Sequence, residues 1–363
     1  MLVVILLWIL GFTVYASQDM NNLTRVIIPF AVFGIFAFLW KLKSTAKQIV
    51  FSVVIKGASL FMSIGITLTS FDLLGFNIFH PPLEFVQFNI WIFLTLISML
   101  FASMIFRTKF ISDNHYERYP AFRVDMKKVV FLIPAYNESA SIGKLVKDIK
   151  SLYPESKLIV MDNNSSDATA EIALANGATV LQEWKQGKGY AMRSGLQYVS
   201  QLDYDLVIMM DADLTYKPED ALKLINYSAS GGYGVLLGSR LKGKREDGAI
   251  TAFNTLGNYL LTIFANLLYG TSHSDICTGY WLFRKEAVEL LNEIGLKSTG
   301  FGLEAEMVSV FAQNDIVTKD LPIAYGHRVA GHSHLQPIKD GVRIFFVLIN
   351  NWIFSRKIST SNE

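Results

Sequence analysis

From Lys127 onward, short apolar runs alternate with segments whose apolar residues recur at helical spacing. The predicted strands cover residues 129–133, 158–161, 179–181, 206–210 and 235–238. The predicted helices cover residues 140–152, 168–175 and 190–202, and a fourth begins near Pro218. Strands that alternate with helices build a mostly parallel sheet with helices on both faces. We therefore predict an α/β domain over residues 127–337.

Residues 1–110 have a different character, because they hold most of the apolar excess of a chain that is 51% apolar. Four apolar runs cover residues 1–16, 26–40, 49–71 and 88–106. A helix needs about 20 such residues to cross a bilayer, so the first two runs must recruit flanking residues. The first run has neither a basic leader nor a clear cleavage site, which favours a retained anchor. We predict an all-α membrane domain with four transmembrane helices.

The charges of the loops between these runs predict an orientation. The loop 41–48 has three lysines and the segment 107–128 has six basic residues, whereas the loop 72–84 has none. Basic loops remain on the cytoplasmic side of a membrane. We therefore expect a multi-pass protein of the cell membrane whose termini and α/β domain are cytoplasmic.

The rest of the composition excludes two classes of function. Residues 107–363 contain 28 basic and 28 acidic residues, whereas a nucleic-acid-binding domain needs a basic face. Cys277 is the chain's single cysteine, so an intrachain disulfide is impossible and a reducing compartment is indicated. We expect no nucleic-acid partner.

Polar segments follow three of the predicted strands, at residues 134–138, 162–167 and 211–213. Parallel strands bring their carboxyl ends to one edge of the sheet, where α/β proteins bind ligands. If the extended backbone continues past residue 210, Asp211 and Asp213 project to the same side. Two carboxylates suit a Mg²⁺ or Mn²⁺ ion that completes its shell with substrate phosphates. The alternative is a polar turn without a metal.

An aromatic ring, a carboxylate and a pair of metal-binding aspartates at one edge suit the base, the ribose and the diphosphate of a nucleotide, respectively. Lys188 lies between two glycines at a predicted helix start, where free amides favour an anion. The alternatives are structural, because Pro134 is also a turn residue and Asp167 is also a helix cap. The phosphate-loop and dinucleotide glycine patterns are absent from the sequence, which argues against an NTPase or a dehydrogenase.

Seven blocks of sequence follow one another at residues 133–138, 162–169, 187–191, 211–213, 238–240, 275–280 and 328–333. In this order they resemble the family 2 glycosyltransferases of the GT-A fold, in particular their polyprenyl-phosphate branch, which includes dolichyl-phosphate mannose synthase and undecaprenyl-phosphate glycosyltransferases. The resemblance covers residues 127–336 and implies a Rossmann-like sheet. It also implies a metal-dependent, inverting transferase that moves a sugar from a nucleotide sugar to a polyprenyl phosphate.

The resemblance also implies roles for single residues. Arg240 faces the acceptor phosphate and Arg328 closes over the diphosphate. Asp211 and Asp213 bind the metal, with Ala212 between them at the donor. The base and ribose are held by Pro134, Tyr136, Glu138 and Asp162.

The sequence departs from the mannose synthase pattern at four positions. Thr215 replaces a glutamine, and Asn254 and Asn258 replace an arginine and a serine at the acceptor phosphate. His334 replaces a lysine after Ser333. The sugar, the nucleotide (UDP or GDP) and the polyprenol (dolichol or undecaprenol) therefore remain open.

Glu304 and Glu306 are candidates for a general base or for groups that orient the sugar. The alternative is an acidic first helical turn, which the helix dipole favours. A phosphate acceptor is already an anion, so a strong base is dispensable.

The segment 338–363 contains an aromatic-rich apolar stretch, residues 342–354, followed by Arg356 and Lys357. It predicts an amphipathic helix at the membrane interface, with docking against the catalytic domain as the alternative.

Two further functions remain open, a membrane glycolipid or polysaccharide synthase and a non-enzymatic membrane scaffold for the translocation of lipid-linked glycans. The Gln-x-x-Arg-Trp pattern usual in processive synthases is absent from the sequence. A homo-oligomer is possible.

Overall fold

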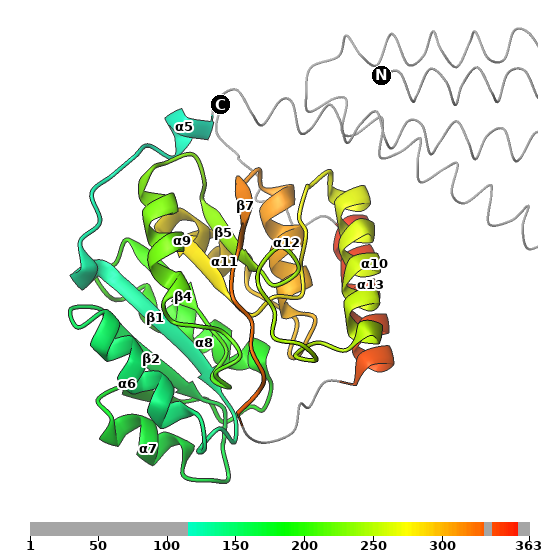
Figure 1. The fold of residues 1–363 in the computed structure, drawn as a ribbon. Helices are drawn as coiled ribbons and strands as arrows, with labels where there is room; N and C mark the ends of the chain where they lie inside the picture. The colour runs from blue at the N-terminus through cyan, green and yellow to red at the C-terminus, as the bar shows by residue number, and fades with distance from the viewer. Residues whose placement is uncertain (1–114, 330–335, 355–363) are drawn as a thin grey trace, which may run out of the picture. The chain divides into compact units, whose positions relative to one another are not determined.

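The computed structural model describes residues 115–329 and 336–354 (Figure 1). The predicted membrane domain, together with Ser333 and His334, lies outside the described residues. Among the helices that are described, none combines the length and apolar character needed to cross a membrane.

Within the described residues, seven strands form one sheet in the order β3-β2-β1-β4-β6-β5-β7. Their bounds are β1 Val129–Ala135, β2 Lys157–Asp162, β3 Thr179–Gln182, β4 Leu206–Met209, β5 Val235–Ser239, β6 Trp281–Arg284 and β7 Thr318–Pro322. The pairs β1–β2, β1–β4, β2–β3 and β5–β7 are parallel. This is the mixed, Rossmann-like sheet of the GT-A fold, so the predicted fold of this domain is confirmed.

One strand departs from the predicted alternation. The strand β6 is antiparallel to both β4 and β5 and separates them. The predicted strand 235–238 is therefore not the next neighbour of β4. The strands β6 and β7 were not predicted, because their place depends on pairing across long stretches of chain.

Helices cover both faces of the sheet, as expected (Figure 1). One face packs against α6 Ile142–Leu152, α7 Thr169–Ala175 and α9 Asp220–Ala229. The other packs against α8 Lys188–Val199, α11 Lys285–Ile294 and α12 Leu303–Gln313. The strand β1 serves both cores, since Val130 and Leu132 belong to one and Phe131 and Ile133 to the other. This alternation explains why the strand is apolar throughout.

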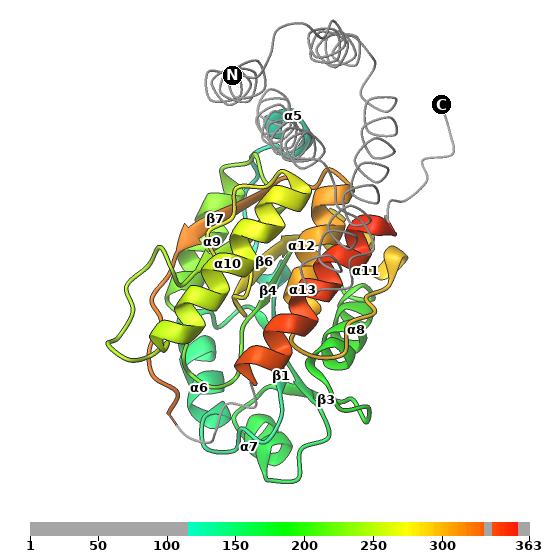
Figure 2. The same cartoon turned by 90° about the vertical axis from the view of Figure 1, so that its right-hand side faces the viewer.

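Two long helices, α10 Ala252–Tyr269 and α13 Pro337–Ile353, lie side by side outside α12 (Figure 2). The rings of Phe264 and Phe345 stack with centroids 4.5 Å apart. The Asn351 side chain donates to the Ser309 hydroxyl at 2.7 Å. One face of α13 is thus docked on the domain, which was the alternative for this segment. The remaining short pieces are α5 His115–Arg118 and the 3-10 helix Met126–Lys128.

Candidate active site

The loops after β1 and β2 are joined to each other by hydrogen bonds. The backbone amide of Asn137 donates to the Ser165 hydroxyl at 3.0 Å, and that of Glu138 donates to the Thr169 hydroxyl at 2.8 Å. Asn137 has a φ of 53°, a left-handed conformation that asparagine tolerates better than most residues. We call the edge of the sheet where β1, β2 and β4 end the strand-end edge. Hydrogen bonds between the loops after β1 and β2 therefore hold the conformation of this part of it.

The aspartate pair follows β4, which ends at Met209. Residues 212 and 213 form a turn, so the strand does not continue through the aspartate pair, and the expectation that extended backbone places both carboxylates on one side was wrong. Leu214 has a φ of 64°, which is costly for a bulky side chain. The Asp213 carboxylate accepts from the Thr215 amide at 3.1 Å and from its hydroxyl at 2.6 Å. Thr215 therefore orients Asp213.

Each aspartate of the pair contacts a different basic residue. The Lys188 ammonium lies 2.6 Å from Asp211 Oδ1 and 2.7 Å from Glu304 Oε1. Arg328 Nη1 lies 3.1 Å from Asp213 Oδ2, and its Nη2 pairs with Glu138. We call these six residues the charged row. It contains four carboxylates and two basic groups, so its formal charge is minus two.

Burial and charge shift the acid–base properties of the row. Burial, and then the charge of Asp211, raise the pKa of Asp213 above its ordinary value. Burial likewise raises the pKa of Glu138. Burial by itself lowers the pKa of Lys188, but the carboxylates of Asp211 and Glu304 outweigh it and raise that pKa overall. The ammonium therefore stays charged, and the row favours an added cation.

The donor atoms of the row fit a divalent ion. Asp211 and Asp213 supply carboxylate oxygens, and no group of three His, Cys, Asp or Glu residues able to hold a metal occurs in the described residues. Two protein ligands leave coordination positions for phosphate oxygens, as Mg²⁺ sites require. A Cβ at Gly279 would lie 2.1 Å from Asp211 Oδ2, so the glycine leaves room for this carboxylate.

Asp162, at the end of β2, is 2% exposed. Its Oδ2 accepts from the Gln182 side chain at 2.8 Å. Its Oδ1 is buried and has no hydrogen-bond partner in the described part of the chain. A buried oxygen without a partner is costly, so this atom is suited to accept a hydrogen bond from a ligand.

The other predicted nucleotide residues differ in exposure. Pro134 is buried within β1, where it pairs in register with Met161. Tyr136 is half-buried just beyond that strand. The Ala212 side chain is buried in the core between the sheet and α6, α7 and α9. Ala212 therefore offers a ligand its backbone rather than its methyl group.

Arg240, just after β5, is 8% exposed and lies beside Asp275. Its Nε and Nη2 donate to Oδ2 and Oδ1 of Asp275 at 2.7 and 2.8 Å. Its guanidinium carbon lies 5.5 Å from the centre of the Tyr325 ring. Two of its donor nitrogens are thus already engaged within the protein.

Glu304 and Glu306 have different partners, although both lie in the first turn of α12. Glu304 faces Lys188, whereas Glu306 accepts from the amides of Lys297 and Ser298 at 2.8 and 2.6 Å. Glu306 is 1% exposed. Its carboxylate therefore fixes the loop before α12, and sequence spacing alone did not separate these two roles.

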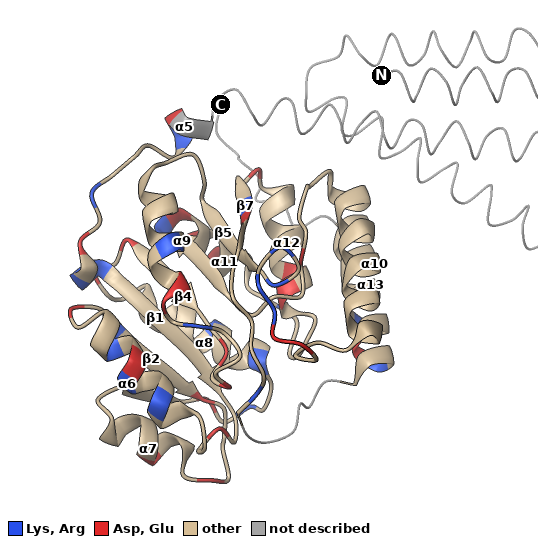
Figure 3. Ribbon diagram, viewed as in Figure 1, with Lys and Arg blue, Asp and Glu red and all other residues tan. Residues whose placement is uncertain are grey.

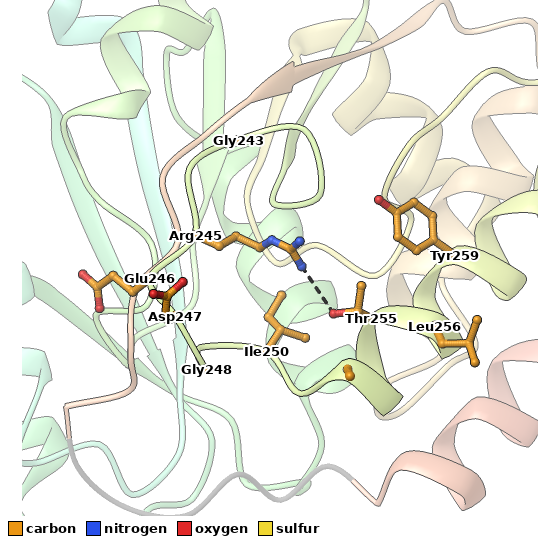
Figure 4. A pocket seen from close by; sticks show the side chains of 10 residues that line it. Gly243, Arg245, Glu246, Asp247, Gly248, Ile250, Thr255, Leu256 and Tyr259 are labelled. Carbon is orange, nitrogen blue, oxygen red and sulfur yellow. Dashed lines mark hydrogen bonds between the residues drawn. The ribbon is translucent and has the colours of Figure 1, made fainter.

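A pocket of about 680 Å³ lies between the loop 243–250 and the start of α10 (Figure 4). Arg245 extends into it and donates to the Thr255 hydroxyl at 3.3 Å, and Glu246 and Asp247 also belong to its lining. Ile250, Leu256 and Tyr259 supply apolar and aromatic lining. Asn254 and Asn258 lie half-buried on the same two turns of α10 and do not line it. No motif in the sequence indicates this pocket.

Comparison with known proteins matches residues 130–291 to the model of glycosyl transferase family 2. The low-salt glycan biosynthesis hexosyltransferase Agl6 of Haloferax volcanii is 33% identical over 62% of this chain and 54% of that protein. The dolichyl-phosphate hexose transferase of the same organism is 31% identical over 58% of this chain and 87% of that protein.

A solved structure is similar in fold. It is glucosyl-3-phosphoglycerate synthase from Mycobacterium tuberculosis in complex with Mn²⁺, UDP-glucose and phosphoglyceric acid. Its TM-score is 0.50 at 20% identity, over 64% of this chain and 85% of that one. At this identity the likeness supports the fold alone.

Proposed function

Since this chain belongs to glycosyl transferase family 2, we propose that it transfers one sugar from a nucleotide sugar to a polyprenyl phosphate, with inversion at the sugar carbon. The observation that carries the proposal is the charged row, which sets Asp211 and Asp213 between Lys188 and Arg328. Its excess negative charge suits a divalent cation, and its basic groups suit a diphosphate.

The donor would occupy the edge where β1, β2 and β4 end. Asp211 and Asp213 would hold a Mg²⁺ or Mn²⁺ ion, which when bound neutralises charge on the diphosphate. The buried Oδ1 of Asp162 would accept from an N–H or O–H group of the base or ribose. Uracil and guanine both carry such N–H groups, which agrees with a UDP- or GDP-linked donor.

The reaction needs charge stabilisation more than proton transfer. As the bond between sugar and diphosphate breaks, negative charge grows on the leaving oxygen, where Arg328 and Lys188 are positioned to stabilise it. The acceptor phosphate attacks the sugar carbon from the opposite side, and this single displacement inverts its configuration. Because the acceptor oxygen is already an anion, Glu304 is free to pair with Lys188 rather than act as a base.

The face formed by α10 and α13 supports a lipid acceptor. Five large apolar or aromatic side chains on each helix are more than a third exposed: Phe253, Leu256, Tyr259, Leu260 and Ile263 on α10, and Ile338, Val342, Phe345, Phe346 and Ile353 on α13. The helix α10 carries no charged residue (Figure 3). Exposed apolar side chains gathered on two neighbouring helices fit a bilayer surface. We propose that it meets the cytoplasmic leaflet of the cell membrane, in which residues 1–110 would anchor the chain.

The pocket beside Arg245 would receive the acceptor's phosphate. No ion pair joins Arg245 to a carboxylate in the described residues, unlike Arg240 with Asp275. The hydroxyl of Thr255 offers a further donor. Leu256 belongs both to the pocket and to the exposed face of α10. A phosphate at Arg245 would therefore leave its hydrocarbon chain along apolar surface.

The full-length chain in lipid nanodiscs, with a polyprenyl phosphate and radiolabelled UDP- and GDP-sugars, tests the function. Radioactivity should move into the organic phase as a lipid carrying one sugar, and Asp211→Asn should abolish the transfer. A ladder of longer products would favour a processive synthase. Absence of lipid-linked product with every donor, while the protein remains folded, would overturn the proposal.

A further inference from the structure

Lys188 forms an ion pair with a carboxylate that we propose as a metal ligand. Its ammonium lies 2.6 Å from Oδ1 of Asp211, one of the two carboxylates proposed to bind the cation. The Lys188 side chain is only 20% exposed. An ammonium and a divalent cation repel each other at this range, so both cannot be held against the same oxygen. A metal ion that binds Oδ1 of Asp211 must therefore change the partner of Lys188.

The backbone that carries Lys188 is fixed. A Cβ at Gly187 or Gly189 would lie 2.2 or 1.8 Å from the carbonyl oxygens of Thr299 and Ser298, so only glycines fit on both sides of the lysine. The Gly189 amide donates to the Thr299 carbonyl at 3.1 Å. The loop that supplies these carbonyls is in turn fixed by Glu306. Movement at this site is therefore restricted to the flexible side chain of Lys188.

Glu304 is the second partner of the ammonium, at 2.7 Å. Its side chain is 8% exposed, so complete departure of Lys188 would leave a buried carboxylate without a counter-charge. Such a loss is strongly unfavourable. Lys188 can therefore exchange its contact with Asp211 while it keeps its contact with Glu304.

We propose that Lys188 is a displaceable counter-ion of Asp211, which the metal moves aside onto Glu304 and which then donates its freed N–H to the donor's diphosphate. The inference rests on the proposed function and adds a dependence between two ligands. A metal alone must compete with Lys188, whereas a metal that arrives with a diphosphate gives the displaced ammonium a new acceptor. Metal and nucleotide therefore strengthen each other's binding, and this coupling is reciprocal.

Binding of Mn²⁺ to the full-length chain in detergent, followed by the electron paramagnetic resonance of the free ion, tests the inference without turnover. Titrations are made alone, with saturating UDP and with saturating GDP. Lys188→Gln removes the competitor, so the affinity for Mn²⁺ alone should rise about tenfold and the gain from nucleotide should shrink about as much. Glu304→Gln leaves Lys188 on Asp211 alone, so the affinity for Mn²⁺ alone should fall several-fold.

Lys185→Gln is the matched control, since it removes an exposed positive charge three residues away; its Mn²⁺ affinity should stay within about twofold of wild type. Lys188→Arg keeps a cation on Asp211 and should resemble wild type. Opposite shifts in the glutamine variants of Lys188 and Glu304 are the signature of displacement. A purely structural role would weaken Mn²⁺ binding in both and lower both melting temperatures.

The outcomes separate this inference from the proposed function. Equal or weaker Mn²⁺ binding by Lys188→Gln, beside wild-type protein that binds Mn²⁺ with a nucleotide, overturns the inference alone. If wild-type protein binds no Mn²⁺ with either nucleotide, the metal role in the proposed function fails and the inference fails with it.

Discussion

The strand-end edge and the face of α10 and α13 are built in opposite ways. At the edge, polar groups fix one another, as the amides of Asn137 and Glu138 do with side chains from the next loop. The helix face instead presents exposed apolar side chains such as Leu260 and Phe346, at 59% and 61%. Hydrogen bonds are directional, whereas the hydrophobic effect is not. The first region suits a ligand of defined shape, and the second suits a flexible hydrocarbon chain.

The two regions meet around the buried pair of Arg240 and Asp275. The residue after Asp275, Ile276, donates its amide to the Thr262 hydroxyl of α10 at 3.3 Å. Tyr325 stacks on Arg240 and also contacts the ring of Tyr216, which follows the aspartate pair. Substitutions at the edge, at this junction and on the helix face should therefore have distinct effects, which the following experiments compare from the largest to the smallest.

At the edge, Asp213→Asn should lower kcat by about a thousandfold, since it removes a carboxylate of the proposed metal pair. The melting temperature should not fall, because burial raises the pKa of Asp213 and the charged form is already disfavoured. Sugar transfer and thermal unfolding measure the two effects. Asp203→Asn is the control, because it changes an exposed carboxylate at the other end of β4. An unchanged rate of sugar transfer in Asp213→Asn would contradict the expectation.

At the junction, Asp275→Asn should destabilise the fold by about 3 kcal/mol, because it leaves the Arg240 guanidinium buried without its counter-charge. Denaturant unfolding measures this loss. The double variant with Arg240→Gln should recover part of the stability, since it removes the isolated charge. A loss under about 1 kcal/mol would mean that water reaches Arg240 and that the two regions are not joined by a dry ion pair.

On the helix face, Leu260→Glu combined with Phe346→Glu should raise the KM for the polyprenyl phosphate about tenfold, because charged groups oppose contact with a lipid. The KM for the nucleotide sugar and the melting temperature should not change. Leu222→Glu, on α9 and 52% exposed, is the matched control. Equal effects of the double variant on both substrates would remove the distinction between the two regions.

The smallest expected effect is that of Asp320, in β7, on the melting temperature at low pH. Burial by itself raises the pKa of Asp320, but hydrogen bonds from His273 and Ser274 outweigh it and hold that pKa below its ordinary value. This carboxylate therefore stabilises the fold above the ordinary Asp value of about 3.9 and loses that contribution as pH falls through the lower folded value. The melting temperature of Asp320→Asn should fall less steeply than that of wild type below pH 4. Parallel curves would show that Asp320 contributes nothing to acid sensitivity.

Local sequence predicted the strand-end edge because its polar residues follow apolar runs directly, as Asp211 follows Met210. The same reasoning missed which charged groups pair with each other in the site, since Lys188 and Glu304 are 116 residues apart in the chain. It missed β6 for a related reason, because the pairing of Met209 with Trp281 has no local signature. Contacts between distant segments depend on the whole fold.

The helix face was harder to predict than the edge. The segment 342–354 is apolar on more than one side, so its pattern does not reveal which side docks. In the fold, Ile344 and Leu348 are buried in the core while Phe346 between them is exposed. The docking alternative therefore holds for one face of this helix, and contact of its exposed face with a membrane stays a prediction.

The exposed side chains of α10 and α13 also affect how the protein behaves in the test tube. A chain shortened to begin at residue 115 would still carry this face, and in plain buffer it would pair with other copies or adsorb to surfaces. Removal of the first 114 residues is thus a poor route to a monodisperse sample. Detergent, or glutamates at positions such as 260 and 346, would be needed to keep the catalytic domain in solution.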